Sequence, residues 1–206
     1  MEKRIGVLDI GIGNIGAFER AFRDIGHVMT RVRASEEFLN VHAIVLPGVG
    51  AFDVVMDKIN NSGIREALEV AVMKERKPIL GVCSGMQVMF ERSEEGVASG
   101  LGWIGGVVSK IERKGDRPVP HMGWNKVRAV GNHGPTQSLE DREFYFLHSY
   151  HAIARDEVDV VLKADYGTDI NAMVTKENIF GTQFHPEKSH KNGLELLKIF
   201  AETMYA

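Results

Sequence analysis

The chain has 206 residues, of which 44% are hydrophobic and 26% are charged, and its net charge is -3. This is enough chain for one full hydrophobic core, and we expect a single domain over residues 1–206. The sequence has no basic run, no membrane-length apolar run and no export signal, so we expect no nucleic acid or membrane partner and a cytoplasmic location.

Apolar runs alternate with amphipathic segments in the first half of the chain. The predicted elements are a strand at 5–10, a helix at 17–26, strands at 27–32 and 43–49, a helix at 64–75, a strand at 78–83 and a helix at 84–94. Alternating strands and helices predict an α/β fold, with a mostly parallel central sheet and helices on both faces. Such sheets bind ligands beyond the carboxyl ends of their strands.

The second half has a different pattern. Short strand-like runs separated by turns extend from residue 102 to residue 184, and a helical pattern returns only at 192–205. We therefore expect a strand-rich second half within the same domain.

Cys83 is the only cysteine of the chain and lies in GVCSGMQ (81–87). A predicted strand runs into it, a predicted helix leaves it, and Gly81 and Gly85 flank it, which is the layout of a nucleophile elbow with cysteine in place of serine. The helix N-terminus would favour the thiolate. The alternative is a buried structural cysteine, since free cysteine is among the most buried residue types.

QFHPEKS (183–189) could supply a base for that thiol. His185 and Glu187 are two residues apart and project to the same side of extended chain, and Pro186 keeps His185 out of a helix. An imidazole base oriented by a carboxylate is what a nucleophilic thiol requires. Taken alone, a His-x-Glu pair is weak evidence for a catalytic base, because such pairs are common on protein surfaces.

VLPGVG (45–50) ends another predicted strand with a glycine-rich turn. Attack on an amide passes through an oxyanion that needs two donors, usually backbone N–H groups. We expect one from Ser84 and the other near Val49. The alternative is an ordinary turn at the end of a strand.

GIGNIG (11–16) matches the dinucleotide fingerprint G-x-G-x-x-G. That fingerprint also needs an acidic residue after the next strand, and Glu36 and Glu37 lie at about that distance without closing a clear apolar strand. We therefore expect no cofactor here, and no metal.

The motifs PGVG (47–50), G-x-C-x-G-M-Q (81–87) and HPEKS (185–189), in this order, resemble the class I, or triad, glutamine amidotransferases. FYFLHSY (144–150) and PHMGWN (120–125) narrow the resemblance to the glutaminase subunits of imidazole glycerol phosphate synthases, of histidine biosynthesis. It extends from residue 9 to residue 200 and implies the flavodoxin-like fold of this family. Ile10, Gly16 and Ser84 depart from the usual family pattern.

The resemblance implies a mechanism. Cys83 would attack the side-chain amide of glutamine, His185 would move the proton, and Glu187 would orient His185. The oxyanion donors would be the N–H groups of Val49 and Ser84. The residues implied in substrate binding are Gly48, Gln87, Ser149 and Tyr150.

The resemblance also implies a partner, because ammonia from such subunits passes into a separate (β/α)8-barrel cyclase subunit of a heterodimer. The residues implied at that interface are Asn14, His121, Met122, Trp124, Asn125 and Lys188. For Trp124 the alternative is an ordinary core aromatic. Two other functions stay open, namely ammonia supply to a sugar-amidating enzyme of surface-polysaccharide synthesis, and a stand-alone cysteine hydrolase.

Overall fold

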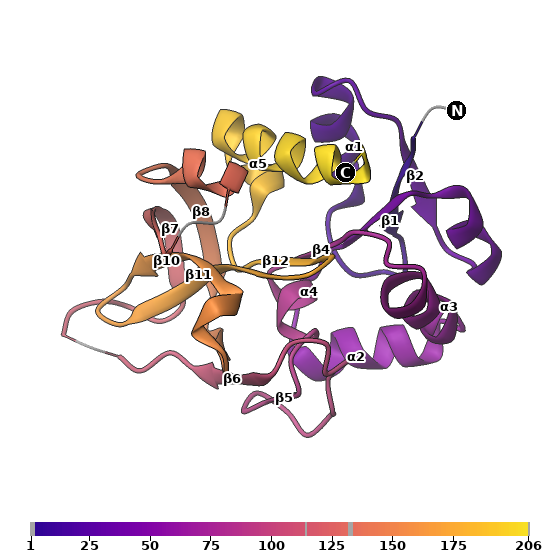
Figure 1. The fold of residues 1–206 in the computed structure, drawn as a ribbon. Helices are drawn as coiled ribbons and strands as arrows, with labels where there is room; N and C mark the ends of the chain where they lie inside the picture. The colour runs from indigo at the N-terminus through magenta and orange to yellow at the C-terminus, as the bar shows by residue number, and fades with distance from the viewer. Residues whose placement is uncertain (1–2, 114, 132–133, 206) are drawn as a thin grey trace.

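The computed structural model describes residues 3–113, 115–131 and 134–205. Within these residues, one nine-stranded sheet has the strand order β2-β1-β3-β4-β12-β11-β10-β7-β8 (Figure 1). Its strands, in chain order, are β1 (Ile5–Leu8), β2 (Met29–Val32), β3 (Ala43–Leu46), β4 (Ile79–Val82), β7 (His121–Ala129), β8 (Glu143–His148), β10 (Val160–Asp165), β11 (Asp169–Lys176) and β12 (Ile179–Thr182). The five strands from β2 to β12 in this order pair in parallel, and the remaining pairs are antiparallel.

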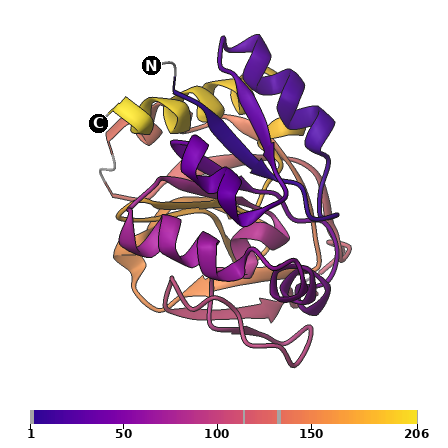
Figure 2. The same ribbon diagram turned by 90° about the vertical axis from the view of Figure 1, so that its right-hand side faces the viewer.

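Helices cover both faces of the parallel part of the sheet. The helices α1 (Ile15–Asp24) and α5 (His190–Glu202) lie on one face, and α2 (Phe52–Asn61) and α3 (Arg65–Glu69) lie on the other (Figures 1 and 2). Each face has its own apolar core. Phe18, Phe22 and Phe200 belong to the first, and Phe52, Met56 and Leu68 belong to the second. The predicted α/β fold is confirmed, with a parallel region of five strands and helices on both faces, and the whole sheet is mixed.

The strand-rich second half is also confirmed. It supplies the antiparallel half of the large sheet and most of a small sheet with the order β5-β6-β9, built from β5 (Arg92–Ser93), β6 (Gly106–Lys110) and β9 (Tyr150–Ala154). The two ends of the described chain lie side by side, with the Lys3 ammonium 4.6 Å from the ring centre of Tyr205 (Figure 2).

Two predicted helices differ from those in the structure, and a third helix has no counterpart in the prediction. The helix predicted over 84–94 is the single turn α4 (Ser84–Gln87), because the carbonyls of Val88, Met89, Phe90 and Glu91 accept backbone N–H groups from residues 100–104. Helix α2 was not predicted, although its buried Phe52, Val55, Met56 and Ile59 have helical spacing. The helix predicted over 64–75 begins as α3 and continues as a π-helical turn, Val70–Lys74.

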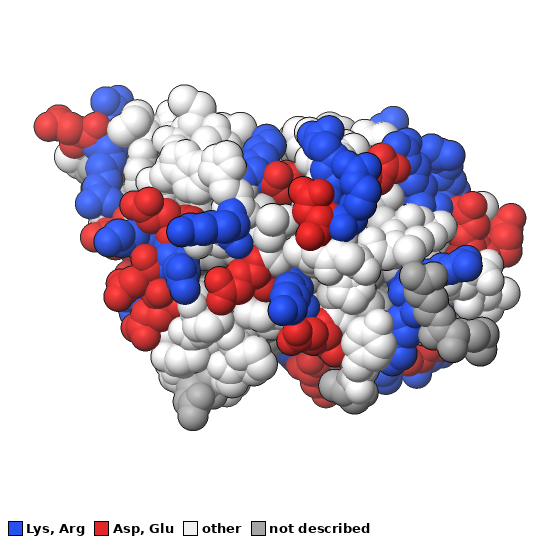
Figure 3. Space-filling view, turned by 90° about the horizontal axis from the view of Figure 1, so that it is seen from above, with Lys and Arg blue, Asp and Glu red and all other residues white. Residues whose placement is uncertain are grey.

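Charged side chains of both signs are interspersed on the face that α1 and α5 cover (Figure 3). No helix within 3–113, 115–131 and 134–205 is long and apolar enough to cross a membrane.

The topology brings the three sequence motifs together. β3 and β12 both pair in parallel with β4, with Leu46 opposite Gly81 and Thr182 opposite Val82. The segments that follow these strands are therefore neighbours at one edge of the sheet. They carry PGVG, Cys83 and QFHPEKS.

Candidate active site

Cys83 lies between β4 and α4 in a backbone conformation that L-residues rarely adopt, with φ 55° and ψ -115°. The turn needs the glycines beside it. A Cβ on Gly81 would lie 2.7 Å from the carbonyl oxygen of Gly85, and one on Gly85 would lie 2.1 Å from that of Leu46. The predicted elbow is thus present. Because α4 is one turn long, its dipole is a weaker support for a thiolate than the predicted long helix would be.

The loop after β3 packs directly on this elbow. A Cβ on Gly48 would lie 1.9 Å from the backbone nitrogen of Gly85, so no side chain fits at position 48. The Ser84 hydroxyl donates to the carbonyl of Gly50 at 2.6 Å and joins the two loops. Val49, between these glycines, is 55% exposed at the rim of the site.

His185 and Glu187 form the predicted pair. Nδ1 of His185 lies 2.9 Å from Oε1 of Glu187, and Cys83 is near enough to the imidazole to raise its pKa. The side chains of the pair are only 4% and 3% exposed. Pro186 starts a short 3₁₀ turn after His185, which stays extended. Ser189 fixes this turn, since its hydroxyl donates to the His185 carbonyl and accepts the N–H of Tyr145.

The environment favours a charged imidazole. Burial lowers the pKa of His185, but the hydrogen bonds and charges of Cys83 and Glu187 outweigh it and raise the pKa to about 9. Oε2 of Glu187 is buried without a hydrogen-bond partner among the described residues. The imidazolium is therefore the group that balances this buried carboxylate.

A cavity of about 200 Å³ opens above Cys83 and His185. It is smaller than the pockets that hold drug-sized ligands, and it suits a single amino acid. The predicted substrate-binding residues all line it, and its remaining lining includes Glu95 and Leu147. These predicted substrate-binding residues are Gly48, Gln87, Ser149 and Tyr150. The cavity is also lined by Val49 and Ser84, the predicted oxyanion donors, and by Lys188, predicted at the partner interface.

Two functional candidates were missed. Gln183 is fully buried; its Oε1 accepts from Nε2 of Gln87 at 3.1 Å and its Nε2 donates to the Cys83 sulfur at 3.8 Å. The sequence feature that points to Gln183 is its position two residues before His185, which puts both side chains on the same side of extended chain. Glu95 lines the cavity, and its Oε2 accepts the Phe52 N–H at 2.8 Å. No pattern around Glu95 marks it.

The residues predicted at a partner interface divide into exposed and buried groups. Met122, Trp124 and Lys188 are exposed, with Met122 at 65% and Trp124 at 47%, so Trp124 is no core aromatic. Asn14 is exposed too, and its side chain caps α1 by accepting the Ala17 N–H at 3.2 Å. His121 is buried and Asn125 is partly buried.

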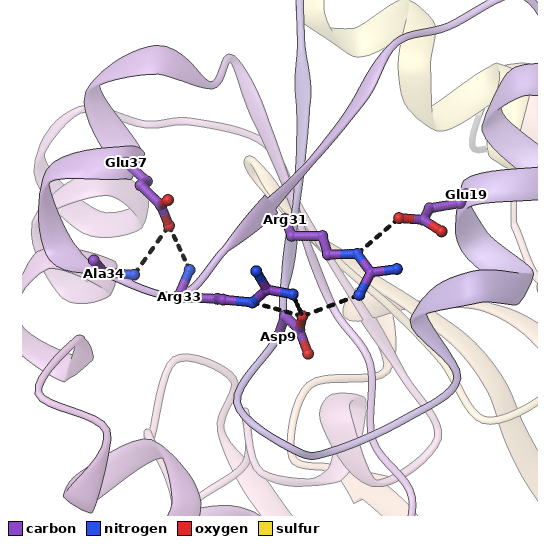
Figure 4. A network of polar contacts seen from close by, with 6 residues as sticks. All are labelled: Asp9, Glu19, Arg31, Arg33, Ala34 and Glu37. Carbon is purple, nitrogen blue, oxygen red and sulfur yellow. Dashed lines mark hydrogen bonds and ion pairs between the residues drawn. The ribbon is translucent and has the colours of Figure 1, made fainter.

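The glycines of GIGNIG serve the turn after β1. Gly11 and Gly13 have positive φ, and a Cβ on Gly13 would lie 2.6 Å from Cβ of Pro47. The acidic position of the fingerprint has a structural task, because Oε2 of Glu37 accepts the N–H groups of Arg33 and Ala34 (Figure 4). Local turn geometry therefore accounts for this motif.

The fold and the arrangement of the site are those expected of a glutamine amidotransferase. A sequence model of the glutamine amidotransferase class-I proteins matches residues 6–204, and the chain belongs to this family. The fold agrees, since a crystal structure of a glutamine amidotransferase covers 98% of this chain and 99% of its own, with a TM-score of 0.75 at 19% identity.

Relatives narrow the family further. The chain is 46% identical over 201 residues to the imidazole glycerol phosphate synthase subunit HisH of Leptospira interrogans. The aligned region covers 96% of this chain and 98% of the relative. It is 43% identical over 199 residues to subunit HisH 2 of Pseudomonas aeruginosa, with the same coverage.

Proposed function

We propose that the chain is the glutaminase subunit of an imidazole glycerol phosphate synthase, which hydrolyses glutamine and supplies the ammonia to a partner subunit. One observation carries the proposal. A buried Cys83–His185–Glu187 constellation lies at a cavity of amino-acid size, in a chain that is 46% identical to such a subunit over nearly its full length.

The chemistry follows from this geometry. His185 takes the proton of the Cys83 thiol, and the sulfur attacks the carboxamide carbon of glutamine. The resulting tetrahedral oxyanion collapses with loss of ammonia, which takes this proton from His185. A γ-glutamyl thioester on Cys83 remains. Water, deprotonated by His185, attacks the thioester and releases glutamate. Glu187 holds Nδ1 of His185, so that Nε2 faces the reaction.

The oxyanion would be stabilised by backbone N–H groups on either side of the thiol. Ser84 follows Cys83 directly, and its N–H is one donor. Val49 is the second, from the loop that Gly48 holds against the elbow. Each such donor is typically worth a factor of about 10² to 10³ in kcat.

The polar groups of the cavity match a free amino acid. Nε2 of Gln87 donates to the Tyr150 carbonyl at 2.7 Å and to Gln183, which commits its hydrogens and leaves Oε1 as an acceptor. Glu95 is a second acceptor. We assign Oε1 of Gln87 and the Glu95 carboxylate to binding of the α-ammonium group of glutamine. Gly48 and the Ser149–Tyr150 backbone would hold the rest of the substrate in the cavity.

We further propose a (β/α)8-barrel cyclase subunit as the partner in a heterodimer. The exposed apolar side chains Met122 and Leu147 are opposite each other on β7 and β8, Trp124 is on the same strand as Met122, and Leu147 also lines the cavity. An apolar surface at the mouth of an ammonia-producing cavity suits a partner that covers the exit. Asn14, Asn125, His121 and Lys188 complete the proposed interface.

The test is glutamate release by the purified chain, measured alone and with the cyclase subunit and its nucleotide ligand. We expect strong stimulation by the cyclase, and no release from Cys83→Ala although this variant still binds the partner. Glutamine hydrolysis by the Cys83→Ala variant would contradict the assignment of the nucleophile.

A second destination for the ammonia is a sugar-amidating enzyme of surface-polysaccharide synthesis. The observation that keeps it open is that Ile10, Gly16 and Ser84 depart from the usual pattern of the histidine-pathway subunits. Labelling of Cys83 by a glutamine-analogue alkylator, without stimulation by the cyclase, would favour it. Full activity without any partner would instead favour a stand-alone hydrolase.

A further inference from the structure

A continuous line of hydrogen bonds connects a surface hollow with the proposed active site. The hollow has a volume of about 710 Å³ and is lined by Asn125, His121 and Tyr166 among others. From it, Nδ2 of Asn125 contacts Nε2 of His121 at 3.3 Å, and Nδ1 of His121 contacts Nε2 of His148 at 3.0 Å. Nδ1 of His148 reaches the Tyr150 carbonyl at 2.9 Å.

The same carbonyl accepts the Gln87 amide, so the line continues into the cavity through Gln87 and Gln183 to the Cys83 sulfur. A carbonyl oxygen has two lone pairs and can take both donors. His148 and Gln87 therefore hold the Tyr150 carbonyl from two sides. A shift of this carbonyl would release the amide of Gln87.

The partners fix the direction of every bond in this line. The Tyr150 carbonyl only accepts, so Nδ1 of His148 carries a hydrogen and, in a neutral ring, its Nε2 accepts. Nδ1 of His121 must then donate, and its Nε2 must accept. Asn125 can supply that donor, because its Nδ2 also donates to the Asp165 carbonyl at 2.9 Å, which identifies this atom as nitrogen.

Packing holds both rings in place. His121 is stacked between Phe146 and Tyr166, with ring centres at 4.6 and 3.9 Å, and His148 lies edge-on to it. Both rings are neutral at physiological pH. Burial, with the Arg117 charge, lowers the pKa of His121 to about 4, and burial, with the neighbouring histidines, lowers that of His148 to about 3.

We propose that His121 and His148 are positioning residues for glutamine binding, which act as two neutral Nδ1–H imidazoles in series to hold the Tyr150 carbonyl that fixes Gln87. This inference rests on the proposed glutaminase function. It adds two histidines to the residues proposed to bind glutamine. His148 lines the cavity itself, whereas His121 lines only the surface hollow. Neither ring takes part in proton transfer.

The first test measures alkylation of Cys83 by 6-diazo-5-oxonorleucine, a glutamine analogue, in the complex with the cyclase. The half-saturating concentration reports binding, and the limiting rate reports the reactivity of the thiol. His148→Leu should raise the half-saturating concentration about tenfold, as expected for a lost hydrogen bond, and change the limiting rate by less than about threefold.

Asparagine is the matched rescue, because its amide nitrogen can occupy the place of Nδ1. His148→Asn should return the half-saturating concentration to within about threefold of the wild type. His151→Asn is the control, since His151 is also buried but lines a separate cavity with Glu94 and Asn171. It should leave both parameters unchanged.

A spectroscopic test needs no variant. In ¹⁵N spectra of the histidine side chains at neutral pH, both His121 and His148 should be neutral with the hydrogen on Nδ1. The more common Nε2–H form, or an imidazolium, at either residue would overturn the proposal. So would an unchanged half-saturating concentration in a folded His148→Leu variant, or a folded His148→Asn variant that behaves as His148→Leu does.

The two proposals fail in different ways. If the wild-type protein is not alkylated at Cys83, the glutaminase assignment is wrong and the positioning role falls with it. If the wild type is alkylated saturably and the His148 variants match it, only the positioning role is wrong.

Discussion

At the scale of single residues, the proposed site depends on a buried carboxylate that helps to keep a buried imidazole charged. Oε1 of Glu187 is bonded to Nδ1 of His185, and Oε2 has no hydrogen-bond partner among the described residues. His185 lies between this carboxylate and the thiol. A raised imidazole pKa favours the form that can donate a proton to departing ammonia. Loss of either charge should therefore affect the chemistry more than the binding of glutamine.

Glu187→Gln removes the carboxylate charge that helps to raise the pKa of His185, while the amide oxygen can still accept from Nδ1. Burial would then lower this pKa with less opposition, and the upper pKa of the pH–rate profile should move down from about 9. We expect kcat for glutamine hydrolysis to fall by a factor of about 10² to 10⁴, with a much smaller change in KM. A variant with an unchanged pH profile would show that Glu187 does not act on His185.

The residues that could be predicted belong to motifs in which spacing carries the chemistry. Cys83 lies between two glycines after a strand, and His185 and Glu187 share one side of extended chain. Gln183 obeys the same period of two but has no typical catalytic side chain. Glu95 reaches the cavity from the loop between β5 and β6. Only the tertiary structure brings it there.

At the scale of elements, the site is a contact between two turns that leaves no room for side chains. Gly48 and Gly85 meet backbone to backbone, where the segment after β3 crosses the elbow after β4. The third segment, after β12, is held by the His185 N–H bond to the Tyr145 carbonyl on β8. The antiparallel half of the sheet thereby positions His185, the proposed base.

Gly48→Ala places a Cβ 1.9 Å from the Gly85 nitrogen, so one loop must move. We expect the free energy of unfolding to decrease by about 1–3 kcal/mol or more, as for other overpacked sites, together with loss of glutaminase activity. Urea unfolding measures the first effect. Gly16→Ala is the matched control on α1, where the nearest atom lies at 3.9 Å, and it should be neutral or slightly stabilising.

The elements show why local pattern predicts some segments and misjudges others. The strands β1, β3 and β4 are fully buried apolar runs, and α1 and α5 have one apolar face, so their patterns were clear. Residues 88–91 look helical. Their carbonyls are instead taken by residues 100–104, a contact between segments that no local pattern contains.

At the scale of the whole molecule, the buried histidines make stability depend on pH. The unfolded chain protonates His121 and His148 near pH 6.5, whereas the folded chain does so only near pH 4 and pH 3. Between these values only the unfolded state binds the protons, so acid favours unfolding. The free energy of unfolding should therefore fall as the pH decreases below about 6.5.

His148→Asn removes one of these titrating groups. Between pH 7 and pH 5 we expect the variant to lose about 2 kcal/mol less of its unfolding free energy than the wild type does. Urea unfolding at the two pH values gives the difference. An equal loss in both proteins would mean that His148 is not buried in its neutral form.

The exposed apolar surface at the cavity mouth should be the part of the molecule that binds the partner. Trp124→Ala removes a half-exposed aromatic anchor and should weaken cyclase binding by about 2 kcal/mol, or about 30-fold in Kd. Val97→Ala is the control, because Val97 is 98% exposed on the loop between β5 and β6. Calorimetric titration with the cyclase subunit would detect the difference, and equal affinities would place the interface elsewhere.

The proposed mechanism requires Cys83 to form a covalent γ-glutamyl thioester during glutamine hydrolysis. The most direct measurement is intact-protein mass spectrometry of the chain in complex with the cyclase, quenched in acid during turnover of glutamine. We predict a mass increase of one glutamyl group that peptide analysis locates on Cys83 and that hydroxylamine removes. Rapid glutamine turnover without any adduct in wild type, or an adduct that persists in Cys83→Ala, would contradict this mechanism.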